Sequence, residues 1–274
     1  MTPSADSLAQ DPLVRRLRAA GCVFAEDEAR LLASEASDAE QLEAMVARRE
    51  SGVPLEVVLG WAEFGGLRIS LDPGVFVPRR RTEFLAQRAV AQAHPGAVVV
   101  ELCCGAGAIS AILLANVEGL QVHASDIDPL AVGCARRNLA GPGVSVYEGD
   151  LFKPLPDRLR GQVDLVVANA PYVPTAELGL LPREARQYEP QSALEGGGDG
   201  LEILRRIMAE APQWLAPGAH VLVEASERQI ASLEQSIAGY GLSPQTFRSP
   251  EMEATVVTAT MPAAMPAEGG RQPA

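Results

Sequence analysis

An apolar run, 166–168, leads directly into the turn Asn169-Ala170-Pro171-Tyr172, whose residue types suit the binding of a planar nitrogen group. A nitrogen that carries two N–H groups needs two acceptors once it leaves water. The Asn169 side-chain oxygen and the Ala170 carbonyl supply two, and the Tyr172 ring can cover the face of a flat group. The nitrogen lone pair would then point outward. Because Asn, Pro and Tyr also end strands in ordinary turns, the tetrapeptide needs its sequence context.

That context is a nucleotide-binding pattern upstream of the turn. A β-branched run, 97–100, is followed by Glu101, by a small-residue turn and by a helix-like segment that reaches Ala115. A buried parallel strand that leads through a glycine-rich turn into a helix N-terminus commonly binds nucleotides. Asp126 ends a second apolar run 19 residues after Gly107, where a carboxylate would bind ribose hydroxyls.

The order of the acidic residues narrows the class of nucleotide-binding protein that the pattern predicts. Glu101 ends the first predicted strand, Asp126 ends the second, Asp150 follows the third, and the turn at Asn169 follows the fourth. A lone Gly-x-Gly, here 105–107, would fit a dinucleotide-binding unit equally well. The full series resembles the class I methyltransferases that depend on S-adenosylmethionine.

The resemblance extends to the HemK/PrmC family, which methylates the side-chain amide of the Gly-Gly-Gln loop in peptide-chain release factors. It rests on the segments 54–60, 63–67, 73–79, 188–197 and 199–201, in addition to the motifs above. It implies an α/β fold in which a Rossmann-like, doubly wound and mostly parallel sheet has an antiparallel last strand. A small N-terminal helical domain is implied as well.

The resemblance also assigns roles to residues. Those implied to bind S-adenosylmethionine are Glu101, Leu102, Cys103, Cys104, Gly105, Gly107, Asp126, Ile127, Asp150, Leu151, Phe152 and Asn169. Within this set, Asp126 would bind the ribose, whereas Asp150 and Phe152 would hold the adenine. Those implied to bind the acceptor or to catalyse the transfer are Asn169, Ala170, Pro171 and Tyr172, with Pro78, Arg79 and Glu189 as further substrate contacts.

Three departures from the family pattern stand out. Ala170 replaces the first proline of the usual Asn-Pro-Pro-Tyr turn, so the carbonyl acceptor is kept and a fixed φ is lost. Cys103 replaces the first glycine of the loop, where we interpret it as a structural filler. Arg80 and Arg81 add two cations before Thr82, where they could steer an anionic group.

Two other functions fit the same residues. One is an N-methyltransferase of a free amino acid or small molecule, acting on an amide or guanidino nitrogen such as that of arginine. A guanidinium would need a nearby carboxylate, for which Glu83, Glu189 and Glu195 are available. The lesser alternative is a non-catalytic protein that binds S-adenosylmethionine, with Cys103 and Ala170 as marks of decay.

Composition excludes several classes. A net charge of −12 and a pI near 4.8 argue against a nucleic-acid partner. The four cysteines and three histidines lack metal-ligand spacing, so no metal is expected. The absence of a signal peptide and of an apolar stretch of membrane-spanning length predicts a cytoplasmic protein without a membrane partner. The oligomeric state is left open.

The 274 residues divide into four predicted parts. Residues 1–56 form a small helical domain that is about one helix shorter than the family's, 57–84 a linker with a β-hairpin, and 85–261 the cofactor-binding catalytic domain. Residues 262–274, rich in Pro, Ala and Gly, form a tail predicted to be disordered. The alternation of strands and helices in the third part predicts a site at the carboxyl ends of the parallel strands.

Overall fold

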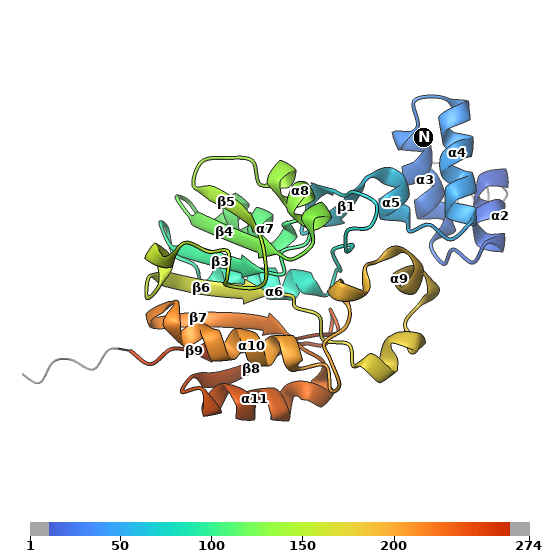
Figure 1. Ribbon diagram of the computed structural model, residues 1–274. Helices are drawn as coiled ribbons and strands as arrows, with labels where there is room; N and C mark the ends of the chain where they lie inside the picture. The colour runs from blue at the N-terminus through green and yellow to red at the C-terminus, as the bar shows by residue number, and fades with distance from the viewer. Residues whose placement is uncertain (1–10, 264–274) are drawn as a thin grey trace, which may run out of the picture.

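Seven strands form the central sheet, and the side chains of its central strands, 98–102 and 163–168, alternate between two buried faces. The computed structural model describes residues 11–263 and shows this sheet beside a small helical unit (Figure 1). Residues 1–10 of the predicted helical domain lie outside the described part, as does the predicted tail apart from residues 262 and 263. In chain order the strands are β3 (Val98–Leu102), β4 (Gln121–Asp126), β5 (Val144–Glu148), β6 (Val163–Ala168), β7 (Leu215–Glu224), β8 (Ser243–Ser249) and β9 (Ala254–Thr260).

The spatial order of the strands is β5-β4-β3-β6-β7-β9-β8. The first five run parallel, and β9 is antiparallel to both β7 and β8. Parallel neighbours require crossover connections, which place helices on both faces of the sheet. The predicted fold class, a mostly parallel sheet with an antiparallel last strand, is therefore confirmed.

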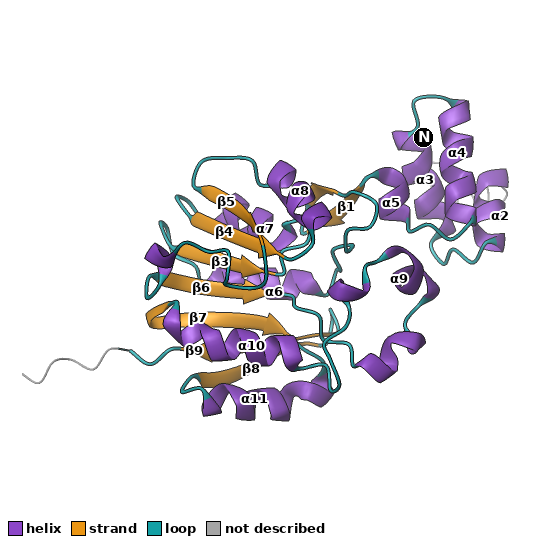
Figure 2. Ribbon diagram, in the orientation of Figure 1, coloured by secondary structure: helices purple, strands orange, loops and turns teal. Residues whose placement is uncertain are grey.

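The two faces of the sheet have separate cores. Val99 and Leu165 point toward one core, and their neighbours Val100 and Val166 point toward the other. Helices α6 (Thr82–Gln92), α7 (Ala108–Asn116) and α8 (Pro129–Asn138) belong to the first layer. Helices α10 (Glu202–Glu210) and α11 (Ile230–Gly239) cover the other face, in front of the sheet in Figure 2.

The helical unit has its own small core. Its helices are α2 (Pro12–Ala19), α3 (Ala25–Glu35), α4 (Ala39–Glu50) and the short α5 (Leu55–Leu59). Asp11 and Asp38 cap α2 and α4 by accepting backbone N–H groups. The side chains that pack together include Val14, Leu17, Leu32, Met45, Val46 and Val58. The predicted division at 56/57 falls inside α5, and the one at 84/85 falls inside α6, which packs on the sheet.

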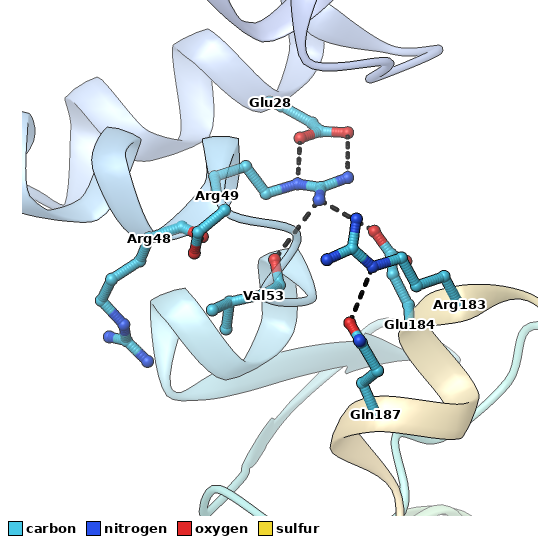
Figure 3. Close-up of polar contacts among 8 residues, drawn as sticks. Glu28, Arg48, Arg49, Val53, Arg183, Glu184 and Gln187 are labelled. Atoms are coloured by element: carbon cyan, nitrogen blue, oxygen red, sulfur yellow. Dashed lines mark hydrogen bonds and ion pairs between the residues drawn. The ribbon is translucent and has the colours of Figure 1, made fainter.

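A hairpin and an ion pair connect the helical unit to the sheet domain. Strands β1 (Trp61–Phe64) and β2 (Leu67–Ser70) pair through a two-residue turn, Gly65-Gly66, in which both φ values are positive. Arg49 of α4 bonds both Glu28 of α3 and Glu184 of α9 (Arg183–Tyr188) (Figure 3). Within residues 11–263, no helix has the length and apolar character needed to cross a lipid bilayer.

Candidate functional site

A cleft of 380 Å³ lies where β3, β4 and β6 end, at the carboxyl edge of the sheet. This volume is within the range of small-molecule sites. Seven residues predicted to bind the cofactor line the cleft, namely Cys103, Gly105, Asp126, Ile127, Asp150, Leu151 and Asn169. The tertiary structure therefore brings together side chains from four separate loops.

Gly105 and Asp126 form the polar wall of the cleft. The Gly105 N–H donates to Asp126 Oδ2 at 2.8 Å, and the Asp128 N–H donates to Asp126 Oδ1 at 2.9 Å. Burial raises the pKa of Asp126, although these backbone donors oppose the shift. A Cβ atom at Gly105 would meet nothing within 4 Å, so the backbone there faces open space. Ile127, 61% exposed, adds an apolar surface suited to a flat ring.

Two non-glycine residues of the cleft have a left-handed backbone. Cys103 has φ 53° and Leu151 has φ 50°, values that L residues rarely adopt. The positive φ of Cys103 explains why a glycine would suit position 103. Burial raises the pKa of the Cys103 thiol well above its ordinary value, so the thiol is neutral and a poor nucleophile.

Asp150 lies in the cleft with cations around it. Its oxygens accept from Arg206 Nη2 at 2.6 and 2.7 Å and from Lys153 Nζ at 2.7 Å. The hydrogen bond from Lys153 and the contacts with Arg206 lower the pKa of Asp150. Phe152, predicted beside it at the adenine, is instead buried in the core and stacks on Trp214 with 5.4 Å between ring centroids.

The remaining residues of the predicted cofactor set do not line the main cleft. Glu101 and Cys104 border a smaller adjoining cavity of 40 Å³, and Leu102 is a core residue. Gly107 caps α7 with φ 80°, a backbone conformation that other L residues rarely adopt, and a Cβ there would also lie 2.8 Å from Leu139 Cδ1. The glycine is therefore explained by the backbone and packing at the start of the helix.

The fully buried Glu101 is held by the first turn of α7. Its Oε2 accepts from the Ser110 N–H at 3.0 Å and also from the Ser110 hydroxyl. Burial raises the pKa of Glu101 to about 7, although the two hydrogen bonds from Ser110 act to lower it. The carboxyl group therefore changes charge near neutral pH.

The turn after β6 belongs to a polar network that the sequence did not predict. Asn169 Nδ2 donates to Thr82 Oγ1 at 3.2 Å, and Thr82 Oγ1 donates to Glu224 Oε2 at 2.8 Å. The Tyr172 hydroxyl donates to Glu224 Oε1 at 2.9 Å. Burial, followed by the nearby Glu224 charge, raises the pKa of Tyr172, so the phenol stays neutral. Among residues 11–263, no donor bonds Asn169 Oδ1 or the Ala170 carbonyl.

Glycines pack directly against the backbone of this turn. A Cβ at Gly196 would lie 2.7 Å from the Pro171 carbonyl oxygen, and one at Gly200 would lie 2.3 Å from that of Tyr172. Gln229 Nε2 also donates to the Tyr172 carbonyl at 2.9 Å. The segment 194–200 therefore fixes the path of the turn, and only glycine permits the close approach.

The predicted substrate contacts Arg79 and Glu189 bond each other. Arg79 Nη2 donates to Glu189 Oε2 at 2.6 Å, and Glu189 also accepts the Val77 N–H at 3.3 Å. Pro78 borders the small cavity that also includes Asn169. The ion pair thus ties the segment after β2 to the segment after α9, beside the cleft.

Sequence reasoning missed Thr82, Glu224 and Arg206. Glu224 is the last residue of β7, so an acid at the carboxyl end of a strand was the available signal. Thr82 follows three consecutive arginines, and nothing in this segment indicates a bond to a residue 142 positions later. For Arg206, whose partner Asp150 lies 56 residues earlier, the sequence offers no local signal.

The sheet, the cleft and the Asn-x-Pro-Tyr turn define a Rossmann-like methyltransferase. The family model of the methyltransferase small domain matches residues 66–183. A methyltransferase from Pyrococcus furiosus shares the fold with a TM-score of 0.53 at 17% identity, covering 80% of this chain and 98% of that chain. The ribosomal protein L11 methylase from Lactobacillus delbrueckii subsp. bulgaricus shares it with a TM-score of 0.52 at 18% identity, covering 71% and 85%.

Sequence relatives identify the family. The chain is 42% identical over 204 residues to the release factor glutamine methyltransferase of Mycolicibacterium smegmatis, covering 72% of each protein. Identity to the Geobacter sulfurreducens release factor glutamine methyltransferase is 41% over 182 residues, which span 66% of this chain and 63% of that relative. The chain belongs to the release factor glutamine methyltransferase family, and the predicted resemblance is confirmed.

One relative has a different name. The 4-amino-L-phenylalanine/4-methylamino-L-phenylalanine methyltransferase of Streptomyces pristinaespiralis is 36% identical over 195 residues, covering 69% of this chain and 66% of that relative. The acceptors in that name are 4-amino-L-phenylalanine and 4-methylamino-L-phenylalanine.

Proposed function

We propose that this protein transfers a methyl group from S-adenosylmethionine to the side-chain amide nitrogen of a glutamine in a release factor. The observation that carries the proposal is the pair of acceptors at the turn, Asn169 Oδ1 and the Ala170 carbonyl, which have no donor of their own among residues 11–263. Ala170 is only 1% exposed, and a buried carbonyl without a partner is uncommon. Asn169 is partly buried, so its Oδ1 remains accessible to a bound group. Two acceptors without donors suit the two N–H groups of a primary amide.

The cleft supplies a binding site that fits S-adenosylmethionine. The open face at Gly105 allows close approach to the backbone, and Asp126 offers carboxylate oxygens for ribose hydroxyls. Ile127 and Leu151 provide apolar surface for the adenine, with Asp150 beside them. We assign the ribose to Asp126 and the adenine to this apolar part of the cleft.

When bound, S-adenosylmethionine supplies an electrophilic methyl group. The protein's part is to hold the acceptor nitrogen, and Asn169 and Ala170 do so through their two carbonyl oxygens. Their dipoles stabilise the positive charge that develops on the nitrogen during transfer. The methylated amide then releases its extra proton to solvent, because a protonated amide is strongly acidic. Tyr172, which is neutral, covers the turn and takes no proton.

The test is methylation of a recombinant release factor by the wild-type protein and by Asn169→Ala. We expect mass spectrometry to place the methyl group on glutamine, and we expect kcat to fall on the order of 100-fold in the variant because one acceptor is lost. Binding of S-adenosylmethionine, measured by calorimetry, should change little. Asn116→Ala removes an asparagine whose side chain bonds the Ile112 carbonyl of its own helix, and it serves as the matched control. Full turnover in Asn169→Ala with cofactor bound would refute the assignment.

A free amino acid is the second candidate acceptor, supported by the Streptomyces relative. The carboxylates considered for a guanidinium are largely engaged, since Glu189 bonds Arg79 and Glu195 accepts from Thr175 and Gln191. These bonds favour a neutral amide or aromatic amine over arginine. Transfer to 4-amino-L-phenylalanine or free glutamine, without transfer to a release factor, would select this candidate.

We also propose that the protein acts in the cytoplasm. All four cysteines, Cys22, Cys103, Cys104 and Cys134, are free thiols, which suits a reducing compartment.

A further inference from the structure

We infer that Thr82 and Glu224 are positioning residues that fix which way the Asn169 side-chain amide faces. The inference rests on the proposed function, because it explains how the amide oxygen is presented to the acceptor nitrogen. The network links the N-terminus of α6, the end of β7 and the turn after β6.

Glu224 is the anchor of the network. Its side chain is buried, with the residue 2% exposed, and it accepts from three donors. These are Thr82 Oγ1 at 2.8 Å, the Tyr172 hydroxyl at 2.9 Å and Arg81 Nε at 3.0 Å. An ionised carboxylate can only accept, so both hydroxyl groups must direct their protons toward it.

The direction of the Thr82 hydroxyl decides the direction of the Asn169 amide. A hydroxyl group has a single proton, and that of Thr82 is committed to Glu224. Only lone pairs are then left facing Asn169, so the amide presents Nδ2 to Thr82, at 3.2 Å. The opposite orientation would set Asn169 Oδ1 against the Thr82 oxygen with no proton between them.

The orientation of the Asn169 amide decides which atom faces the acceptor group. With Nδ2 bonded to Thr82, Asn169 Oδ1 faces away and is free to accept an N–H of the acceptor group. In the reversed orientation the amide would present its own N–H donors, which cannot bind a nitrogen that is itself a donor. The network thus selects an acceptor group that carries N–H.

The test compares variants that differ in one hydroxyl group. Thr82→Val keeps the shape of the side chain and removes the hydroxyl, whereas Thr82→Ser keeps the hydroxyl. We expect Thr82→Val to lower kcat about 10- to 100-fold because the amide is free to reverse, with the Kd for S-adenosylmethionine unchanged. Thr82→Ser should recover most of the activity, which a role in packing alone would not predict.

A control and a second variant complete the test. Thr246 donates to Glu234 Oε1 at 2.6 Å between β8 and α11, so Thr246→Val removes a similar bond far from the turn and should leave kcat unchanged. Glu224→Gln leaves a single acceptor oxygen, and because Arg81 can only donate, that oxygen should face Arg81 and Tyr172. The amide N–H groups then face Thr82, which frees the Thr82 proton to turn toward Asn169. We expect it to lower kcat as Thr82→Val does, and it keeps the inference testable if Thr82→Val does not fold.

The outcomes separate the inference from the function on which it rests. Wild-type kcat in a folded Thr82→Val or Glu224→Gln protein, with Asn169→Ala inactive, would overturn the positioning role alone. Equal losses in Thr82→Val and Thr82→Ser would also overturn it, because the hydroxyl would then be irrelevant. An active Asn169→Ala protein would overturn the proposed acceptor site itself.

Discussion

Replacing Arg49 with methionine should destabilise the helical unit strongly. The Arg49 side chain is only 11% exposed, and its Nε and Nη2 donate to Glu28 at 2.7 and 3.3 Å (Figure 3). Glu28, whose side chain is 10% exposed, would be left as a buried charge without its partner. Removing one member of such a pair costs about 3–5 kcal/mol.

The second partner of Arg49 provides an internal comparison. Glu184 accepts from Arg49 Nη1 at 2.8 Å, and its side chain is 46% exposed. Solvent screens a pair of this kind, so Glu184→Gln should cost less than about 1 kcal/mol. The double variant Glu28→Gln/Arg49→Met should recover part of the loss, because no unpaired charge remains buried.

Urea unfolding, together with limited proteolysis inside residues 12–59, measures the difference in stability between Arg49→Met and Glu184→Gln. The free energy of unfolding should fall in the order wild type, Glu184→Gln, Arg49→Met. Equal costs for the two single variants would refute the argument, because burial would then not determine the strength of the pair. A fully additive double variant would equally contradict it.

Two further predictions follow from buried groups of the sheet domain. Burial raises the pKa of Glu101 from 4.5 to about 7, so the folded protein binds this proton more tightly than the unfolded chain does. The free energy of unfolding therefore falls as pH rises from 4.5 to 7, and the loss reaches about 3 kcal/mol at pH 8. Glu101→Gln should therefore gain stability at pH 8 relative to wild type and show little difference at pH 4.5 in urea unfolding, and a pH-independent difference would contradict this. Phe152→Ala should cost about 3–5 kcal/mol of stability, because it removes a core ring stacked on Trp214, while leaving cofactor affinity intact. Calorimetry that showed weaker binding without lost stability would return Phe152 to the adenine site.

The sequence by itself determined the features that depend on near neighbours. The run 97–107 specifies a strand, a turn and a helix start, because the β-branched residues and glycines act within a few positions. Asp126 and Asn169 were predictable as site residues because each directly follows or ends an apolar strand, and the carboxyl ends of parallel strands meet at one edge. The residue types of the turn indicated its acceptor chemistry, and the family resemblance added the glutamine amide as the group to be methylated.

Only the tertiary structure decided the partners that meet across long stretches of chain. Thr82 bonds Glu224, 142 residues later, and Arg49 bonds Glu184, 135 residues later, and no local pattern encodes such pairs. The direction of a side chain next to a turn is equally non-local: Phe152 packs in the core against Trp214, 62 residues later, and does not line the cleft. Local sequence sets the backbone path of each element, whereas the packing of the elements against one another decides which polar groups form hydrogen bonds and ion pairs.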